Sequence, residues 1–418
     1  MQLFINFFNS KSISFIDQML VSLSNFFFTF LLIKFLGLEI FGQFTFLWLL
    51  LLLINSIQNA YLISPMLTNA SKKGLSTIDL FYGGVFFQQI IFTVFIFFVV
   101  HFVFKFFGDY ISLYPVSKYA ISFPLVVAAT QLHQFLRRLL FSKELYFKAL
   151  LSDFIAYLFL FTFVIYLYFK SQLNIETIFW SFFISFSIGG IVNFSIIFTL
   201  KFKLNSTFKF IKENWIIGKW MLASSLMLWF SGNLWIINAG IILGPVILGV
   251  VRACQTIISV ANPIFLSFEN IAPGEASRKF KLGGINKMEI YLKKFFLKFL
   301  SPILIITLFI VVFSKFLLTH IYGLEVAKYY YFLIFLSLSL PFTLLRFPLE
   351  YALRTLGKTK PIFISNLITT LIALATSKII ITQFELNGLM FGLLFSQISS
   401  IFIVYLGYLS YHKKIKQI

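Results

Sequence analysis

A succession of apolar runs, from residue 14 to residue 408, constrains this chain more than any other feature. Each run is about twenty residues long, which as a helix matches the hydrocarbon thickness of a bilayer. Only 11% of the 418 residues are charged, and the mean hydropathy is +0.94. A water-soluble domain needs far more polar residues to cover its surface. The sequence therefore predicts an all-α polytopic membrane protein.

Hydropathy predicts twelve membrane-spanning segments in two groups of six. They are residues 14–36, 40–67, 81–104, 119–140, 149–169, 175–200, 215–243, 246–268, 299–318, 330–349, 361–381 and 386–408. We expect an N-terminal bundle over residues 1–200, a cytoplasmic linker over 201–214 and a C-terminal bundle over 215–418. A basic cytoplasmic loop over residues 271–298 belongs to the second bundle.

The positions of the basic residues predict the orientation. Short loops rich in Lys and Arg face the cytoplasm. With the N-terminus inside, 26 of the 34 Lys and Arg residues fall on the cytoplasmic side and seven on the outer side. Arg252 is the one basic residue that this count assigns to neither side. Both termini are therefore expected in the cytoplasm.

The charge distribution and the lack of certain motifs exclude or disfavour several functions. The net charge of +20 follows from membrane topology, so it does not indicate nucleic acid. Cys254 is the single cysteine, and the four histidines have no metal-ligand spacing. The chain has no phosphate-binding loop for ATP. We predict no enzyme activity, no metal and no cofactor, and the short outer loops disfavour a membrane glycosyltransferase or polymerase.

The two halves share a local pattern at an offset of 207 residues. Leu-Gly-x4-Gly begins at Leu36 in the first half and at Leu243 in the second, and Asn55 corresponds to Asn262. Two repeats of six spans each have the same orientation in the membrane. Such repeats are related by a pseudo-two-fold axis along the membrane normal.

Five stretches carry a resemblance to a known family. They are Asp17-Gln18 with Ser24-Asn25, Phe35-Leu36-Gly37 and Phe41-Gly42-Gln43-Phe44; Ser64-Pro65-Met66; the run from Phe135 to Phe141 with Asp153; the run from Arg252 to Thr256 with Asn262-Pro263 and Glu269-Asn270; and the run from Glu350 to Arg354 with the run from Leu356 to Thr359. In this order the sequence resembles the Wzx-type oligosaccharide flippases. These form the polysaccharide transporter (PST) branch of the multidrug/oligosaccharidyl-lipid/polysaccharide (MOP) exporter superfamily.

The resemblance implies a MATE-like fold, with two six-helix bundles around a central cavity. It implies that polyprenyl-diphosphate-linked oligosaccharide repeat units are flipped from the inner to the outer leaflet of the bacterial cytoplasmic (inner) membrane by alternating access. The product would be a surface polysaccharide: lipopolysaccharide O-antigen, capsule or exopolysaccharide. The expected partners are the lipid-linked oligosaccharide, membrane lipids, a glycan polymerase and glycosyltransferases, and we expect a monomer.

Three alternatives stay open: an ion-coupled multidrug antiporter of the same superfamily, a membrane glycosyltransferase or polymerase, and a non-catalytic scaffold for a glycan assembly complex. The chain has no means of hydrolysing ATP, so any energy would come from an ion gradient or the membrane potential. The coupling ion would be H⁺ or Na⁺.

The candidate site residues follow from the need to hold an anionic headgroup inside a bilayer. An unpaired arginine at membrane depth costs at least about 2.5–3.5 kcal/mol, so it marks a functional position. The predicted diphosphate and cavity residues are Arg252, Asp17, Gln18, Asn25, Asn233 and Gln255. The predicted cytoplasmic mouth consists of Arg137, Arg138, Lys219, Arg346, Glu350 and Arg354.

Structural interpretations compete with these roles. Arg252 can extend to the outer interface. Asp17 follows Ser14 at the spacing of a capping box, and Asp153 is expected in the first turn of a helix, where the dipole favours a negative charge. Arg346, Glu350 and Arg354 follow one another at intervals of four residues. They therefore share one helix face, and Glu350 is expected to pair with both arginines.

Overall fold

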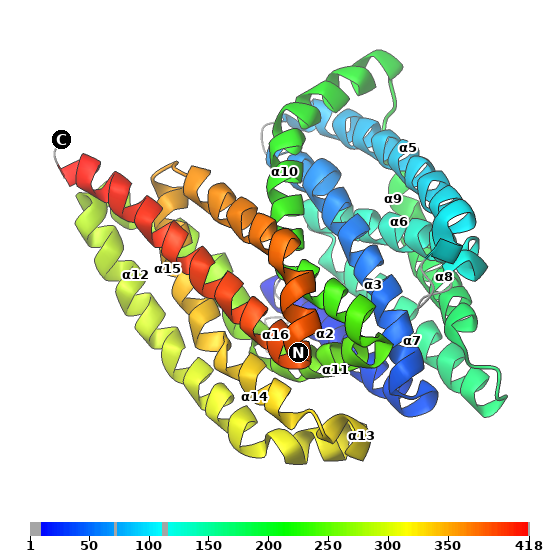
Figure 1. Ribbon diagram of the computed structural model, residues 1–418. Helices are drawn as coiled ribbons and strands as arrows, with labels where there is room; N and C mark the ends of the chain where they lie inside the picture. The colour runs from blue at the N-terminus through cyan, green and yellow to red at the C-terminus, as the bar shows by residue number, and fades with distance from the viewer. Residues whose placement is uncertain (1–9, 71–72, 111–115, 417–418) are drawn as a thin grey trace, which may run out of the picture. The chain divides into compact units, whose positions relative to one another are not determined.

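The computed structural model describes residues 10–70, 73–110 and 116–416, and over these ranges it contains helices and no strand (Figure 1). This confirms the predicted all-α fold. The longer helices of the first half are α2 (Ser10–Leu36), α3 (Leu38–Gln58), α4 (Ser64–Ala70), α5 (Leu75–Phe107), α6 (Ser122–Ser142), α7 (Tyr146–Phe169) and α8 (Ile175–Val192). The short helix α9 (Phe194–Ile197) follows α8, and a π-turn (Asn59–Ile63) joins α3 to α4.

The second half begins within a long helix. Its elements are α10 (Leu204–Leu243), α11 (Pro245–Ile258), α12 (Asn262–Tyr322), α13 (Leu324–Ala327), α14 (Tyr330–Leu338), α15 (Leu340–Thr355) and α16 (Lys360–Lys416). Residues 204–214, predicted as part of a linker, form the first turns of α10. The predicted cytoplasmic ends of the chain, residues 1–9 and 417–418, lie outside the described residues.

Nine helical stretches among the described residues are long and apolar enough to cross a membrane, compared with twelve predicted spans. Part of the difference arises because the stretches that include α12 and α16 each contain two of the predicted spans, one on either side of a break. α12 passes through the predicted basic loop and is broken only at Gly283 and Gly284, and α16 is broken at Glu385. α6, which contains the predicted span 119–140, is not among the nine. Hydropathy locates apolar segments but does not reveal whether the polar residues between them continue the helix.

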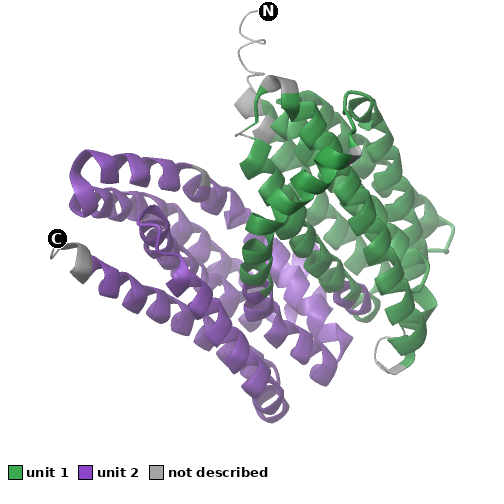
Figure 2. Cartoon of the chain, turned by 90° about the horizontal axis from the view of Figure 1, so that it is seen from above, with its two compact units in different colours: residues 1–40, 47–226 green, residues 41–46, 227–418 purple. Residues whose placement is uncertain are grey.

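The chain divides into two compact units (Figure 2). Unit 1 comprises residues 1–40 and 47–226, and unit 2 comprises residues 41–46 and 227–418. In unit 1, α7 and α6 both pack on α8, and α2 packs on α7. In unit 2, α12 packs on α14 and α15, and α15 packs on α16. These contacts position the two polar clusters described below.

The predicted internal repeat corresponds to a repeated turn. Gly37 precedes α3 with φ 78° and ψ 168°, and Gly244 precedes α11 with φ 93° and ψ 173°. Positive φ values of this kind are accessible to glycine and strained for other residues. Two residues at an offset of 207 therefore have the same unusual backbone conformation before equivalent helices.

Candidate functional site

Three charged side chains from three helices of unit 1 form the Asp17–Arg137–Asp153 cluster. The Arg137 guanidinium, on α6, is ion-paired through one terminal nitrogen with Asp17 of α2. Its Nε lies 2.6 Å from Oδ2 of Asp153 on α7. The two carboxylate side chains are only 1% and 2% exposed, and Arg137 is 13% exposed. Arg137 thus joins two buried acids that are 136 residues apart in the sequence.

Neutral polar side chains extend this cluster toward α8. His133 lies one turn before the arginine on α6, and its Nε2 is 3.5 Å from Asp153 Oδ1. The Ser152 hydroxyl is 3.0 Å from the same nitrogen and donates to the Gly189 carbonyl at 2.8 Å. Asn193 donates to the Ser152 oxygen at 2.7 Å. This arrangement depends on Gly189, because a Cβ there would lie 2.8 Å from a side chain of α7.

The charge balance of the cluster is unusual for a membrane-spanning region. Two carboxylates share one guanidinium, and ionised side chains within a bilayer are costly unless they are paired. Asp17 Oδ1 accepts no hydrogen bond from the described part of the chain. Arg138, the next residue on α6, is half-buried and makes no ion pair with any described residue. The cluster therefore has acceptor capacity for a proton or a small cation. No group of three or more His, Cys, Asp or Glu suited to a bound metal ion occurs among the described residues.

The structure corrects the helix-end interpretations of both aspartates. α2 begins at Ser10 and α7 begins at Tyr146, so Asp17 and Asp153 each stand about two turns inside a helix. Neither helix has an acidic residue in its first turn. The expectation that each aspartate lies at the start of its helix is wrong because the polar residues that precede each apolar run are already helical. The Ser14 side chain, the other half of the predicted capping box, lies outside the described side chains.

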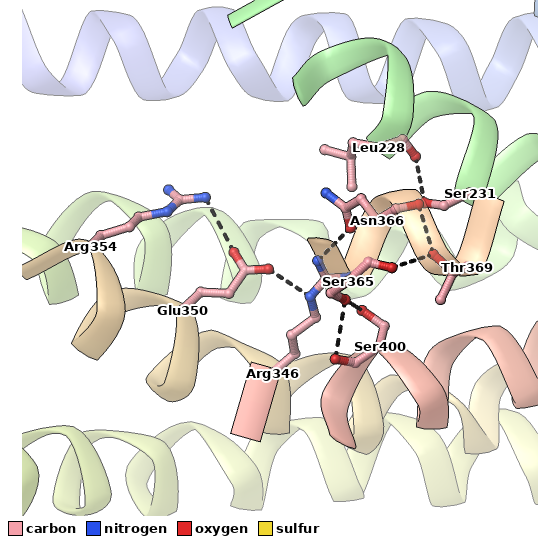
Figure 3. A network of polar contacts seen from close by, with 9 residues as sticks. All are labelled: Leu228, Ser231, Arg346, Glu350, Arg354, Ser365, Asn366, Thr369 and Ser400. Atoms are coloured by element: carbon pink, nitrogen blue, oxygen red, sulfur yellow. Dashed lines mark hydrogen bonds and ion pairs between the residues drawn. The ribbon is translucent and has the colours of Figure 1, made fainter. Parts of the chain in front are cut away.

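A second cluster in unit 2 contains the predicted ion pairs of α15 (Figure 3). Arg346 Nε donates to Glu350 at 2.6 Å, and Arg354 donates to the other oxygen of Glu350 at 3.2 Å. The terminal nitrogen of Arg346 also donates to the Asn366 side chain on α16 at 2.8 Å. The structure thus confirms that these three charged residues pair along one helix face. We call this the Arg346–Glu350–Arg354 cluster.

Hydroxyl groups beside this cluster connect the two parts of α16. The Ser365 and Ser400 hydroxyls are 2.7 Å apart, and Thr369 donates to the Ser365 carbonyl at 2.9 Å (Figure 3). Ser365 precedes the break at Glu385 and Ser400 follows it. The two parts of α16 therefore lie side by side and hold Asn366 in place against Arg346.

Arg252 differs from the arginines of both clusters. It lies in the middle of α11 and is half-buried. Among the described residues its guanidinium makes no ion pair and no hydrogen bond, and its electrostatic neighbour is the neutral Tyr322 hydroxyl. Arg137 and Arg346, by contrast, are both paired with carboxylates. Arg252 is a fixed positive charge in an apolar helix, and no carboxylate of the described residues pairs with it.

The remaining predicted site residues are distributed over both units. Gln18 is exposed on α2, and Asn25 is half-buried on the same helix. In unit 2, Asn233 donates to a carbonyl of its own helix at 2.9 Å, and Gln255 is half-buried on α11. Lys219 is exposed and lies over the ring of its neighbouring tryptophan. None of these five belongs to either charged cluster.

Sequence reasoning did not bring Asp153, His133, Ser152 and Asn193 into the site. A partial signal was present, because His133 stands four residues before an arginine on the same face of a helix. Asp153 likewise lies in an otherwise apolar run. What the sequence lacks is any indication that these residues face Asp17, since the contact arises from helix packing.

Comparisons with known proteins were made by sequence and by fold. No family model matches the sequence, and no curated protein matches it. Solved structures do match. An inward-facing multidrug resistance MATE family transporter of the MOP superfamily superposes with a TM-score of 0.72 at 12% identity, covering 96% of this chain and 95% of the other.

Two further structures show the same likeness. The lipid II flippase MurJ, in an inward closed conformation, matches with a TM-score of 0.66 at 15% identity, covering 94% of this chain and 86% of that one. The eukaryotic MATE transporter AtDTX14 matches with a TM-score of 0.63 at 15% identity, covering 95% and 94%. At these identities the likeness concerns the fold. The chain therefore has the MATE-like fold of MOP superfamily transporters over nearly its whole length.

Proposed function

We propose that this protein transports a polyprenyl-diphosphate-linked oligosaccharide across the bacterial cytoplasmic membrane by alternating access. The observation that carries this proposal is Arg252, a half-buried guanidinium in an apolar helix that pairs with no carboxylate among the described residues. A fixed charge of this kind is unfavourable in a membrane-spanning helix unless it has a partner. An anionic substrate supplies that partner.

The chemistry of the headgroup fits an arginine. A guanidinium presents a planar fork of N–H donors that can pair with two phosphate oxygens at once, and it stays charged at any physiological pH. Diphosphate offers several such oxygens. The sugar and the polyprenyl chain would lie on either side of this contact.

The other arginines support entry of the same headgroup. Arg138 has no ion pair among the described residues, and Arg354 is 49% exposed beside a carboxylate that it shares with another arginine. Both belong to the predicted cytoplasmic mouth. An excess of positive charge attracts an anionic headgroup from the inner leaflet.

Lipid analysis after depletion of the protein tests this function. We expect a diphosphate-linked repeat unit to accumulate on the cytoplasmic side, with loss of the surface polysaccharide. The control is re-expression of the unchanged chain, which should clear the accumulated lipid. Normal surface glycan with no accumulated lipid would contradict the proposal.

A second candidate function is an ion-coupled multidrug antiporter. It is favoured by the Asp17–Arg137–Asp153 cluster, because buried carboxylates with free acceptor capacity suit proton or cation exchange. The likeness to a multidrug resistance MATE family transporter is in keeping with this candidate. Depletion would then increase the accumulation of cationic drugs and leave lipid-linked sugars unchanged.

A further inference from the structure

An apolar groove of about 630 Å³ lies in unit 2 between α12, α15 and α16. These helices are adjacent in Figure 1, and α12 packs closely on α15. Leu292 and Phe296 of α12, Leu345 and Leu349 of α15 and Ile401 of α16 are among the residues that line it. None of the residues of the two charged clusters lines this groove, and neither does Arg252.

One end of the groove is polar. Glu289, Lys293 and Tyr408 line it there. The Tyr408 hydroxyl donates to Glu289, and His412 Nε2 lies 2.9 Å from the same carboxylate oxygen. Glu289 is therefore occupied by contacts within the protein. Lys293 is exposed and makes no ion pair with a described residue.

A second lysine, Lys358, precedes α16 and lies near the C-terminal part of that helix. The Lys358 amine is 5.6 Å from the centre of the Tyr411 ring, and Tyr411 is one turn beyond Tyr408. Both lysines belong to segments that the loop charges predict to face the cytoplasm. The apolar groove thus ends at a cationic rim on the predicted cytoplasmic side.

We propose that this groove binds one anionic phospholipid of the bilayer, with an acyl chain along the apolar walls and the phosphate beside Lys293. Basic pockets between membrane helices on the cytoplasmic side are suited to anionic lipid headgroups. If each chain carbon takes roughly the 30 Å³ of a small molecule in a liquid, the groove holds on the order of twenty carbons, which is about one acyl chain.

The charges and the size identify the occupant. The phosphate of phosphatidylglycerol has no cation of its own and can pair fully with Lys293, whereas the phosphate of a zwitterionic lipid is already neutralised by its own ammonium group. A long polyprenyl chain would exceed the groove. This lipid site does not involve the transported substrate, so its test is separate from the test of the proposed function.

Lipid binding by the purified full-length protein tests the proposal. The protein in detergent is mixed with phosphatidylglycerol, with phosphatidylcholine of the same chains, or with a polyprenyl phosphate. Native mass spectrometry counts the bound lipids, and the thermal unfolding midpoint reports stabilisation. We expect one retained phosphatidylglycerol and a rise of the midpoint, because a ligand that binds only the folded state stabilises it.

Matched variants locate the binding to the groove. Lys293→Glu should weaken phosphatidylglycerol binding about thirty-fold, since one attraction becomes one repulsion. Lys294→Glu is its control, because Lys294 is equally exposed and does not line the groove. Ile401→Trp should fill the groove and abolish binding. Ile403→Trp, at a half-buried position outside the groove, should leave it intact.

Four results would overturn the proposal. Equal binding of both phospholipids, with no effect of Lys293→Glu, would mean that the groove takes any hydrocarbon. Displacement of phosphatidylglycerol by the polyprenyl phosphate would mean that the groove belongs to the transported lipid. Retention of no lipid by the unchanged protein, or unchanged binding in the folded Ile401→Trp variant, would place no lipid in the groove.

Discussion

The two charged clusters have opposite compositions. In unit 1, Arg137 is held between two buried aspartates that come from two other helices. In unit 2, Glu350 is held between two arginines of its own helix, one of which is 49% exposed. One cluster has an excess of acid and is enclosed, and the other has an excess of base and is partly open to its surroundings.

This difference separates two tasks that a transporter of anionic lipids must perform. Buried carboxylates can exchange protons or small cations, whereas guanidinium groups stay charged and attract phosphate. Under the proposed function, the unit 1 cluster would serve ion coupling, and the unit 2 cluster would attract the headgroup at the predicted cytoplasmic mouth before it reaches Arg252. The contrast also predicts how strongly each cluster contributes to stability, since enclosed ion pairs across helices matter more than exposed pairs within one helix.

The largest expected effect is that of Arg137→Ala. Removing the arginine leaves two buried carboxylates without their cation, and breaking a buried pair in this way costs about 3–5 kcal/mol. We expect a sharp fall in the thermal unfolding midpoint and in the yield of folded protein. Arg278→Ala is the control, since that side chain is 63% exposed and pairs only with Glu275. Equal stability of the two variants would contradict the account of unit 1.

Neutralising the whole unit 1 cluster should be milder than breaking it. The triple change Arg137→Met, Asp17→Asn and Asp153→Asn removes all three charges of the cluster, and replacing a buried ion network with neutral residues of similar volume is often neutral in stability. We expect the triple variant to unfold at a higher temperature than Arg137→Ala and to have lost ion-coupled transport. If the triple variant is as unstable as the single one, packing rather than charge explains the cost.

An intermediate effect is expected for Glu350→Gln. The change leaves two arginines close together with only a neutral partner, and losing one partner of a partly buried charged hydrogen bond costs about 1–3 kcal/mol. The unfolding midpoint should fall by less than in Arg137→Ala. A larger fall would mean that the unit 2 cluster contributes more to stability than the unit 1 cluster, which would contradict the comparison.

The smallest effect is expected for Arg354→Ala. Exposed pairs contribute about 0–1 kcal/mol, and Glu350 keeps its contact with Arg346. Stability should be nearly unchanged, while uptake of the anionic lipid from the inner leaflet should slow at low ionic strength. A salt titration of the transport rate checks this, because screening should remove the difference between the variant and the unchanged protein.

Hydropathy predicted the helical fold, and the Leu-Gly-x4-Gly pattern predicted an internal repeat, because both depend on local sequence. Residue spacing predicted the pairing along α15 for the same reason, since i, i+4 contacts are a property of one helix. These patterns did not predict that Asp17 and Asp153 meet at Arg137. That contact depends on how α2, α6 and α7 pack, and no local pattern encodes it.

Both helix breaks lie where the sequence predicts a connection between spans: Gly283 and Gly284 fall within residues 271–298, and Glu385 falls between the spans 361–381 and 386–408. The sequence of α12 around Gly283 and Gly284 contains many lysines, which indicated a loop between two spans. Lysine is a good helix former, so the helix continues on both sides of the glycine pair. Hydropathy measures affinity for lipid and gives no information on where a polar segment stays helical.

The central claim is that Arg252 binds the diphosphate of an anionic lipid, and transport by its variants tests this most directly. The measurement is flipping of a diphosphate-linked oligosaccharide in proteoliposomes, normalised to the amount of reconstituted protein. We expect Arg252→Ala to abolish flipping and Arg252→Lys to restore it only in part, because lysine keeps the charge but loses the fork of donors. Full specific activity of Arg252→Ala would contradict the account.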